Sequence, residues 1–487
     1  MWTALTVLTL CISQAHAGGF VVARFGGEHG HVTTDNATAM YYNPAGISLR
    51  AGTHLYLDGT FAWRSFTYDR DPAAIDNVIA DGETSVGTRA DQIAQNSGEG
   101  GLFNFAAAPF AGVVTDFGVP NLGVGLSFYA PFGGASVYDT KDEYKGTPAF
   151  DGSQRWWAIE GTIRTLYVTG AVAYTIPKLN LSLGVGLNFA RSEVHTIRAR
   201  NATGHDHMTD AEGNPVEGRA IVDVSGNEFA LGGGLIWKPV DNVWLGASYQ
   251  SAPNFGESVL AGTATLVQGR GVYAGGVPEE PDVELKQSLP DIFRLGGRWR
   301  PVDVAEIRLF GELQRWSSFD KQCIIDTSKD QKCDGSTGTV ALLPRDWEDS
   351  FGVRAGGSYW ISPDIELYVG AGFDMSAVPD DTLEAGLYDT DKGTASLGGR
   401  FTLLDGALAI SATYTQVFYA DREIKPRGHV QKGAGTPVDE SAAQNDPIET
   451  ETDINRFGFA TNERNPDSAG TYKQAVGVFN LNVEYNF

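Results

Sequence analysis

Apolar and polar residues alternate through most of this chain, in segments separated by turn-forming residues. Residues 54–68 show two faces of opposite character: Leu55, Leu57, Phe61 and Trp63 on one, and Tyr56, Asp58, Thr60 and Arg64 on the other. Because successive side chains of a strand point to opposite faces, this segment has one apolar side and one wet side. Tilted strands of about 9 to 11 residues are long enough to cross a bilayer. The alternation therefore predicts membrane-spanning strands.

Fourteen segments show this pattern, and the connections between them are short and long in turn. The segments are residues 54–68, 103–119, 122–131, 164–176, 181–198, 225–237, 243–267, 282–299, 305–319, 349–361, 365–378, 395–403, 407–421 and 471–487. The long connections are polar and Gly-rich, and they include residues 69–102, 133–155, 200–222, 321–347 and 424–470. An even number of strands brings both chain ends to one side of a membrane, as in bacterial single-chain barrels. We expect the long loops on the outside of the cell.

A soluble β-sandwich or propeller also has short strands and turns, so alternation alone does not identify the fold class. A membrane barrel is favoured by aromatic residues near strand ends on the apolar face, by the strict alternation of loop lengths, and by the last segment. That segment ends in Phe487, which resembles the terminal signal read by the outer-membrane barrel assembly machinery. A closed barrel is the β-structure that leaves no backbone group unpaired in lipid. The predicted fold is an all-β, 14-stranded antiparallel transmembrane β-barrel.

The first seventeen residues predict export. They contain no charged side chain, include a short apolar run and end in Ala15-His16-Ala17, an A-x-A cleavage signature. The usual Lys or Arg of the n-region is missing, which leaves two explanations open: a start further upstream, or a free amine that serves alone. The apolar run is too short for a membrane anchor. Beyond it, no window approaches the roughly 18 to 20 apolar residues of a spanning helix, which excludes a helical inner-membrane protein.

Charge and cysteine content narrow the function further. Sixty acidic and 36 basic residues give a formal net charge of −24, which argues against nucleic acid or an anionic surface as a partner. Of the three cysteines, Cys11 lies in the predicted signal, so Cys323 and Cys333 remain in the exported chain. In an oxidising compartment we expect these two to close a small loop by a disulfide. A metal site would need more ligands than lie nearby.

The stretch just before the first strand does not alternate. We therefore predict three parts in the chain: a signal peptide (1–17), an N-terminal hatch inside the lumen (18–52) and the barrel (53–487). We expect Thr34 or Asp35 to cap a short helix in the hatch. That helix must end at Asn43, because the residue before a proline avoids helical geometry. The motif Asn43-Pro44-Ala45 thus predicts a turn that completes a compact stopper.

Aromatic residues occur among the polar positions of the wet faces. They are Tyr56, Phe66, Tyr167, Phe310, Trp316 and Tyr368. A purely water-filled pore would not need them. Two explanations stand side by side: the rings fill a tapering interior, or they form apolar stations for a hydrophobic solute.

Catalytic and metal-binding patterns are hard to find in this chain. It has no G-x-S-x-G, no H-E-x-x-H and no phosphate-binding loop. Three groups with possible metal ligands are interpreted as ordinary loop or structural residues: His205-Asp206-His207 with Asp210, Glu28 with His29 and His31, and the acidic cluster at residues 439–453. We therefore predict no enzyme activity, no metal and no cofactor.

Several short motifs resemble those of a known family. They are Gly19-Phe20, residues 36–46 around Asn43-Pro44-Ala45, residues 130–133 (APFG), Leu289-Pro290, residues 316–319 (WSSF), and residues 344–347 with Asp349. Together with the fourteen strands, they make the chain similar to the long-chain fatty acid transporters of the outer membrane, the FadL type, which include aromatic-hydrocarbon channels. The resemblance covers nearly the whole mature chain.

The resemblance implies a monomeric outer-membrane barrel whose lumen is blocked by the hatch. Hydrophobic molecules such as fatty acids or aromatic hydrocarbons would diffuse through it and leave by a kink in the third strand, directly into membrane lipid. On this chain the kink would fall near Gly123 and Gly125, because glycine tolerates a broken ladder. No motif of this chain identifies which of its residues correspond to the ligand-binding residues of the family. A hydrophilic porin and a surface receptor or adhesin remain the alternatives.

Overall fold

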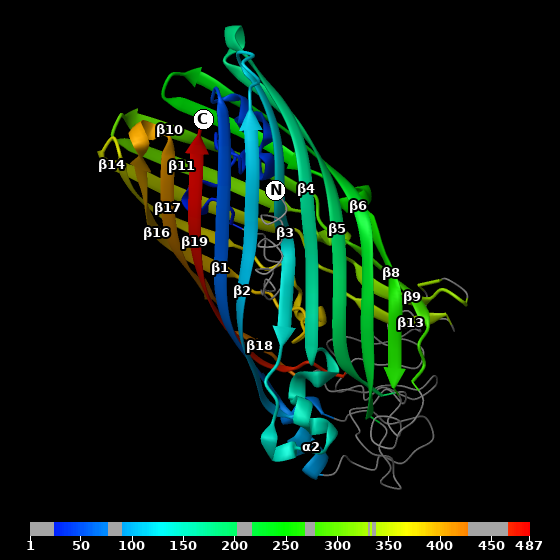
Figure 1. The fold of residues 1–487 in the computed structure, drawn as a ribbon. Helices are drawn as coiled ribbons and strands as arrows, with labels where there is room; N and C mark the ends of the chain where they lie inside the picture. The colour runs from blue at the N-terminus through cyan, green and yellow to red at the C-terminus, as the bar shows by residue number, and fades with distance from the viewer. Residues whose placement is uncertain are drawn as a thin grey trace.

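The computed structural model describes residues 24–75, 90–201, 217–267, 278–329, 332–333, 338–426 and 466–487. Within these ranges the strands form one closed antiparallel barrel (Figure 1). Four features of the sequence lie outside the described residues: the predicted signal, Gly19-Phe20, the histidines His205 and His207, and the acidic cluster at 439–453.

Fourteen strands form the wall, each paired with the next around the barrel. They are β1 (Thr53–Arg70), β2 (Gly98–Thr115), β3 (Leu122–Val137), β4 (Glu160–Ile176), β5 (Leu181–Asn201), β6 (Glu217–Val240), β7 (Val243–Gln250), β10 (Ile292–Val302), β11 (Ala305–Gln314), β14 (Ser350–Ser362), β15 (Ile365–Asp374), β16 (Lys392–Leu403), β17 (Leu408–Tyr419) and β19 (Gly470–Asn486). The last strand closes on the first, with a register from His54↔Asn486 to Arg70↔Gly470. The predicted 14-stranded antiparallel barrel is confirmed.

The two faces of the wall have the inverse polarity of a soluble protein. Large apolar side chains are exposed on the outside, for example Phe103 (67%), Val185 (60%) and Leu295 (70%). Charged side chains are buried on the inside, where Arg294 Nε lies 2.5 Å from Glu312 Oε2 on the neighbouring strand. An apolar exterior around paired polar groups is what a bilayer requires of a barrel.

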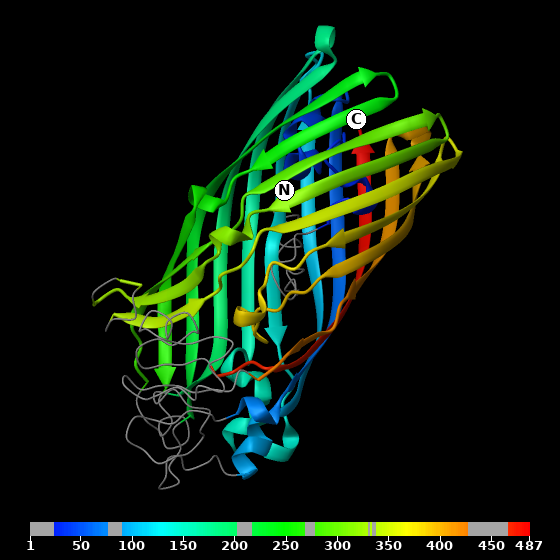
Figure 2. The same ribbon diagram turned by 180° about the vertical axis from the view of Figure 1, so that it is seen from behind.

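Five further strands extend the wall at the end that carries the long loops (Figure 2). They are β8 (Glu257–Val267), β9 (Asp282–Ser288), β12 (Lys321–Asp326), β13 (Thr339–Pro344) and β18 (Arg422–Ile424). The sequence analysis was wrong to make residues 321–347 entirely loop, since they contain β12 and β13. Residues 217–222, also placed in a loop, begin β6. Residues 322–326 of β12 and 217–220 of β6 are buried on both faces, so apolar and polar positions do not alternate there.

Short helices lie in the N-terminal segment and in the connections. The described helices are α1 (Ala39–Tyr42), α2 (Ala90–Asn96) and the 3-10 helices Gly27–His29, Pro44–Ser48, Pro72–Ala74, Asp142–Tyr144, Pro148–Asp151, Ser153–Trp156, Pro177–Leu179, Pro253–Phe255, Trp316–Ser318, Asp380–Thr382 and Leu404–Gly406. Helix α2 lies at the end of the molecule opposite the C-terminus (Figure 1). In the parts of the chain that are described, no helix has the length and apolar character needed to span a membrane.

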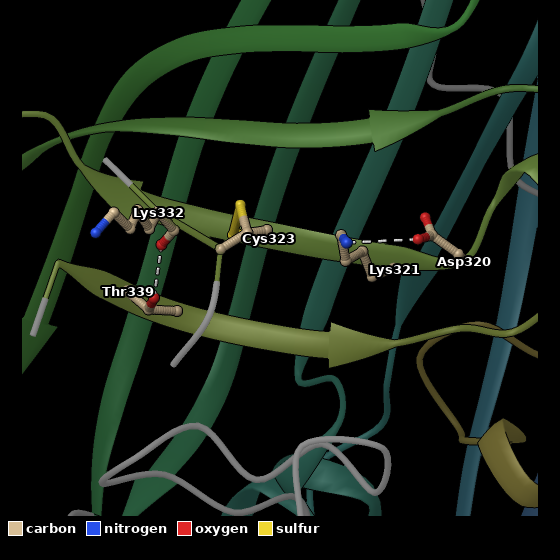
Figure 3. Close-up of a disulfide and its surroundings, with 6 residues drawn as sticks. Asp320, Lys321, Cys323, Lys332 and Thr339 are labelled. Atoms are coloured by element: carbon tan, nitrogen blue, oxygen red, sulfur yellow. Dashed lines mark hydrogen bonds and ion pairs between the residues drawn. A yellow bond between two sulfur atoms is a disulfide. The ribbon is translucent and has the colours of Figure 1, made fainter. Parts of the chain in front are cut away.

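A disulfide joins Cys323 on β12 to Cys333 (Figure 3). Their Cα atoms are 5.9 Å apart, and Cys323 is fully buried. The Thr339 hydroxyl of β13 donates a hydrogen bond to the Lys332 carbonyl (2.9 Å) beside the bridge (Figure 3). The disulfide thus ties the connection between β12 and β13 to the extended wall.

Candidate functional site

The N-terminal segment, defined here as residues 24–52, lies against the inner face of the barrel. Most of its side chains between residues 25 and 48 are buried. Four ionisable residues of the segment contact residues of opposite type in the wall: Arg24 with Asp374 (3.5 Å), His29 with Glu366 (3.1 Å), Asp35 with Arg298 (3.3 Å) and Arg50 with Glu484. These partners stand on β15, β10 and β19, so the segment is attached to several parts of the wall at once.

The titratable groups of the segment are held in defined states. Burial alone would raise the pKa of Asp35, but the guanidinium groups of Arg298 and Arg50 outweigh it and hold that pKa below its usual range. Burial lowers the pKa of His31 well below its ordinary value, so this imidazole is neutral near pH 7. Its Nδ1 lies 3.0 Å from the Thr33 hydroxyl oxygen. Across the described residues, no group of three or more His, Cys, Asp or Glu side chains is placed to hold a metal ion.

Asn43 is the main hydrogen-bonding residue between the segment and the wall. Its backbone is extended (φ −168°), and its Oδ1 accepts from the Ala45 amide at the start of the helix Pro44–Ser48 (3.2 Å). Its Nδ2 donates to the carbonyl of Val32 within the segment (2.8 Å) and to those of Leu235 (3.0 Å) and Ala247 (3.4 Å) in β6 and β7. The departure from helical geometry at Asn43, predicted from Pro44, is confirmed.

The start of the preceding helix was predicted wrongly. Neither Thr34 nor Asp35 caps it, because α1 begins only at Ala39. The Asn36 side chain instead accepts from the Thr38 amide (2.8 Å), which forms an Asx-type turn in place of helix. Asp35 is therefore free to reach Arg298 on the wall.

Strand glycines bring the wall into direct contact with the segment. A Cβ added at Gly123, Gly184, Gly234 or Gly246 would overlap Ile47, Ala45, Asn43 or Val32 respectively, and one at Gly125 would overlap the Met40 sulfur. For Ile47, Ala45 and Val32 the overlapping atoms belong to the backbone, and for Asn43 the overlapping atom is the side-chain amide oxygen. Close backbone approach is a common reason for glycine inside a strand. These glycines, on β3, β5, β6 and β7, form a surface on which the segment rests.

The third strand is irregular, but not where the sequence analysis placed the kink. Gly123 and Gly125 lie in unbroken pairing with β4, opposite Ala173 and Ala171. The register shifts further along, between Tyr129 and Phe132. The residues in between are Ala130 and Pro131, and proline cannot donate to a ladder. A proline inside an alternating segment was the signal that could have located the break.

A gap in the wall follows this break. The ladder between β2 and β3 ends at the pair Phe110↔Tyr129, although β3 continues to pair with β4 as far as Val137↔Glu160. Both strands are fully described. Beyond Phe110↔Tyr129 they share no ladder. The next bond between them runs from the Asp139 amide to the Gly101 carbonyl (2.8 Å). The gap thus spans residues 102–109 of β2 and 130–138 of β3 and its continuation.

Two aromatic side chains of the segment lie just beside this gap. The Phe25 ring lies 5.3 Å from that of Phe110 and 5.4 Å from that of Tyr129, measured between centroids. The Tyr41 ring lies 5.5 Å from Tyr129. Four aromatic side chains, two from the segment and two from the last paired residues of β2 and β3, therefore form an apolar floor at the edge of the gap.

All six aromatic residues proposed for the lumen are buried, and they fall into separate groups. Tyr56, Phe310 and Tyr368 lie around the segment; the Tyr368 ring is 4.8 Å from that of His29. The Tyr167 ring packs next to the floor in a tilted arrangement, 5.7 Å from that of Tyr129. Phe66 and Trp316 belong to clusters nearer the loops, with Tyr388 (4.9 Å) and Trp347 (4.9 Å) respectively. Other buried rings escaped prediction, among them Tyr129, Trp157, Tyr388 and Tyr472.

A cavity opens on the loop side of the floor. Its lining is mainly apolar and comes from β4, β5, β6, β9 and β12, with Ile163, Val194, Val222, Leu285 and Ile324. Trp157 and residues 134–136, which border the gap, also line it. Its polar part includes Arg345, whose guanidinium pairs with Glu384 (2.8 Å). The arrangement can accept an apolar molecule from the loop side and bring it to the gap.

Comparison with known sequences agrees with this geometry. A profile of the family described as "Outer membrane protein transport protein (OMPP1/FadL/TodX)" matches residues 8–460. A protein of Neisseria meningitidis serogroup B whose name describes it as an outer membrane protein is 23% identical over 439 residues, covering 86% of this chain and 88% of that protein.

Solved structures with the same fold cover nearly the whole chain. A FadL homologue of Pseudomonas aeruginosa has a TM-score of 0.70 at 18% identity, covering 97% of this chain and 100% of its own. The toluene transporter TbuX of Ralstonia pickettii has a TM-score of 0.58 at 14% identity, with 98% and 99% covered. The toluene transporter TodX of Pseudomonas putida has a TM-score of 0.57 at 14% identity, with 98% and 99% covered.

Proposed function

The chain belongs to the OMPP1/FadL/TodX family of outer membrane transport proteins, and from this premise we propose that it takes up long-chain fatty acids or similar hydrophobic molecules passively. It is an outer-membrane barrel of a family that transports hydrophobic compounds, a family of channels rather than of enzymes. Two relatives of this fold are named toluene transporters, which supports including aromatic hydrocarbons among the solutes. We also propose that the barrel works as a monomer and that its assembly signal is Phe487.

The route we propose begins in the cavity and ends in the membrane. An apolar molecule enters from the loops, passes Trp157 and meets the floor formed by Phe25, Tyr41, Phe110 and Tyr129. It then leaves sideways between β2 and β3. The observation that carries this proposal is the gap after Tyr129, since it adjoins both the floor and the cavity lining.

The N-terminal segment acts, in this proposal, as a hatch that keeps ions and polar solutes out. Its support is the four ion pairs, the Asn43 contacts and the close packing on strand glycines. A hydrophobic molecule that leaves through the wall never needs the hatch to open. The barrel can therefore stay closed to water while it transports.

Uptake measurements test the proposal. Cells that lack their own transporter, and liposomes, are supplied with this protein and with labelled oleate or toluene. We expect faster uptake of at least one of them than in controls with empty vector or empty liposomes. Rates equal to the controls for both solutes would refute the proposal.

Two alternatives predict different results in the same preparations. A hydrophilic porin would show steady single-channel conductance in the intact protein, which a closed hatch does not allow. A surface receptor or adhesin would lose partner binding but keep uptake when its long loops are shortened.

A further inference from the structure

Arg64, on β1 next to the gap, is a buried cation with unused hydrogen-bonding capacity. Its side chain is fully buried. Its Nε donates to Gln474 Oε1 (2.6 Å), and its Nη1 donates to the Ala135 carbonyl (3.4 Å) and the Ser136 hydroxyl (3.3 Å). Its Nη2 has no hydrogen-bond partner in the described part of the chain. One arm of the guanidinium thus lacks an acceptor.

Arg64 also differs from other buried arginines of the lumen in having no carboxylate partner. Arg155 pairs with Glu217 (2.8 Å), Arg294 with Glu312 (2.5 Å) and Arg345 with Glu384 (2.8 Å). Among the described residues no Asp or Glu oxygen comes within 4.0 Å of the Arg64 nitrogens. A buried charge without a counter-ion is costly. The cost is lowered when an anion binds beside it.

A second donor stands next to Arg64. Asn104 on β2 is its directly opposite residue in the ladder, and opposite side chains have Cβ atoms about 4.5 to 5.5 Å apart. Asn104 is only 7% exposed, and its Nδ2 likewise has no partner within the described ranges. Two buried N–H groups without acceptors therefore lie side by side at the gap.

The surroundings of these donors are aromatic and adjoin the cavity. The Arg64 guanidinium lies 5.0 Å from the centre of the Phe66 ring, and Phe66 in turn contacts Tyr138 (6.1 Å) and Tyr388 (4.9 Å). Two hydrogen-bond partners of Arg64, Ala135 and Ser136, line the cavity itself. A polar head next to an apolar body is the kind of ligand that this combination suits.

We propose that Arg64 and Asn104 bind the carboxylate of an apolar acid while its hydrocarbon part lies among the neighbouring rings. The inference rests on the proposed transport function and narrows its substrate class to anionic, carboxylate-bearing molecules over neutral ones of the same length. Hydrogen bonds between a guanidinium and a carboxylate are roughly twice as strong as neutral ones. Arg64 is thereby a specificity-determining residue of the route.

Oleate and oleyl alcohol test this proposal, since they differ only in the head group. Equilibrium binding of each labelled compound is measured on the purified full-length protein in a non-ionic detergent. We expect oleate to bind about tenfold more tightly than the alcohol, the ratio given by one hydrogen bond to a charged group. Arg64→Gln should abolish this preference and leave alcohol binding unchanged, and Asn104→Leu should reduce it. The matched control is Arg315→Gln, a half-exposed arginine paired with Asp291, and it should bind like the wild type.

Equal affinity of the wild type for both compounds would overturn the inference. So would an Arg64→Gln variant that loses both compounds equally, because Arg64 would then only hold β3 in place. Heat-dependent mobility on gels reports whether each variant is folded. If Arg64→Gln does not fold, the inference is tested by the ratio of oleate to oleyl alcohol affinity in the wild type and in Asn104→Leu. A wild type that takes up neither oleate nor toluene refutes the transport proposal itself. Uptake of oleate and oleyl alcohol at equal rates refutes this inference alone.

Discussion

Asn43 connects four backbone groups, from the segment, β6 and β7, through a single amide. Asn43→Leu keeps a similar volume but leaves those groups without their partner, at a cost of about 1 to 3 kcal/mol for each buried group that stays unpaired. We expect the hatch of this variant to open transiently, seen as brief conductance events in planar bilayers where the wild type is silent. The control is Asn36→Ala, because the Asn36 side chain accepts hydrogen bonds from Thr38, which also belongs to the segment. If Asn43→Leu showed no more conductance events than the wild type, the motif Asn43-Pro44-Ala45 would be a structural turn without a role in closing the barrel.

At the residue scale, the sequence predicted local geometry better than tertiary contacts. The end of α1 at Asn43 follows from one neighbouring proline, so it could be read directly. The helix start could not, because Asp35 is recruited by Arg298, more than 250 positions away. Gly123 and Gly125 were singled out correctly as unusual but for the wrong reason: what they accommodate is Ile47 and Met40. Which side chain faces a glycine is known only once the strands are folded.

At the scale of the element, the bulge in β3 is what separates β3 from β2. Between Tyr129 and Phe132 the strand advances three residues while its partner β4 advances two, from Tyr167 to Thr165. Deleting Pro131 removes the extra residue and the missing amide, so β3 can continue its ladder with β2 and close the gap. We expect uptake of oleate and toluene to fall towards that of protein-free liposomes, with heat-dependent mobility unchanged. Deleting Gly118 in the short turn after β2 is the control and should leave uptake intact. A Pro131 deletion that transports normally would exclude the gap as the exit.

The elements themselves were predictable wherever lipid imposes the pattern. Leu55 and Leu57 face hydrocarbon, whereas Tyr56 and Asp58 face the lumen. This requirement makes apolar and polar residues alternate in the sequence with a period of two. In β12 and β13 that constraint is absent, and a stretch interrupted by Cys323 and Cys333 reads as loop. The gap could not be predicted from alternation, because alternation in β3 stops at the break and its loss does not tell which neighbouring strand β3 leaves.

At the scale of the whole molecule, the proposed route makes hatch movement unnecessary. Ser48 Oγ of the segment and Thr175 Oγ1 of β4 lie 2.9 Å apart, a separation that suits replacement by two cysteines. The variant Ser48→Cys, Thr175→Cys should form a disulfide that fastens the segment to the wall. Cys323 and Cys333 are already paired with each other, and Cys11 lies in the predicted signal. Gel mobility with and without reductant shows whether the new bridge has formed.

Uptake through the locked barrel then separates two routes. A molecule that leaves between β2 and β3 passes above the segment, so oxidised and reduced protein should take up oleate at the same rate. A molecule that crosses the whole lumen must displace Phe25 and Tyr41, so the oxidised form should be blocked and the reduced form active. The single variant Ser48→Cys controls for reductant itself. Loss of uptake on oxidation, restored by reductant in the double variant only, would refute the lateral route and place the exit at the periplasmic end.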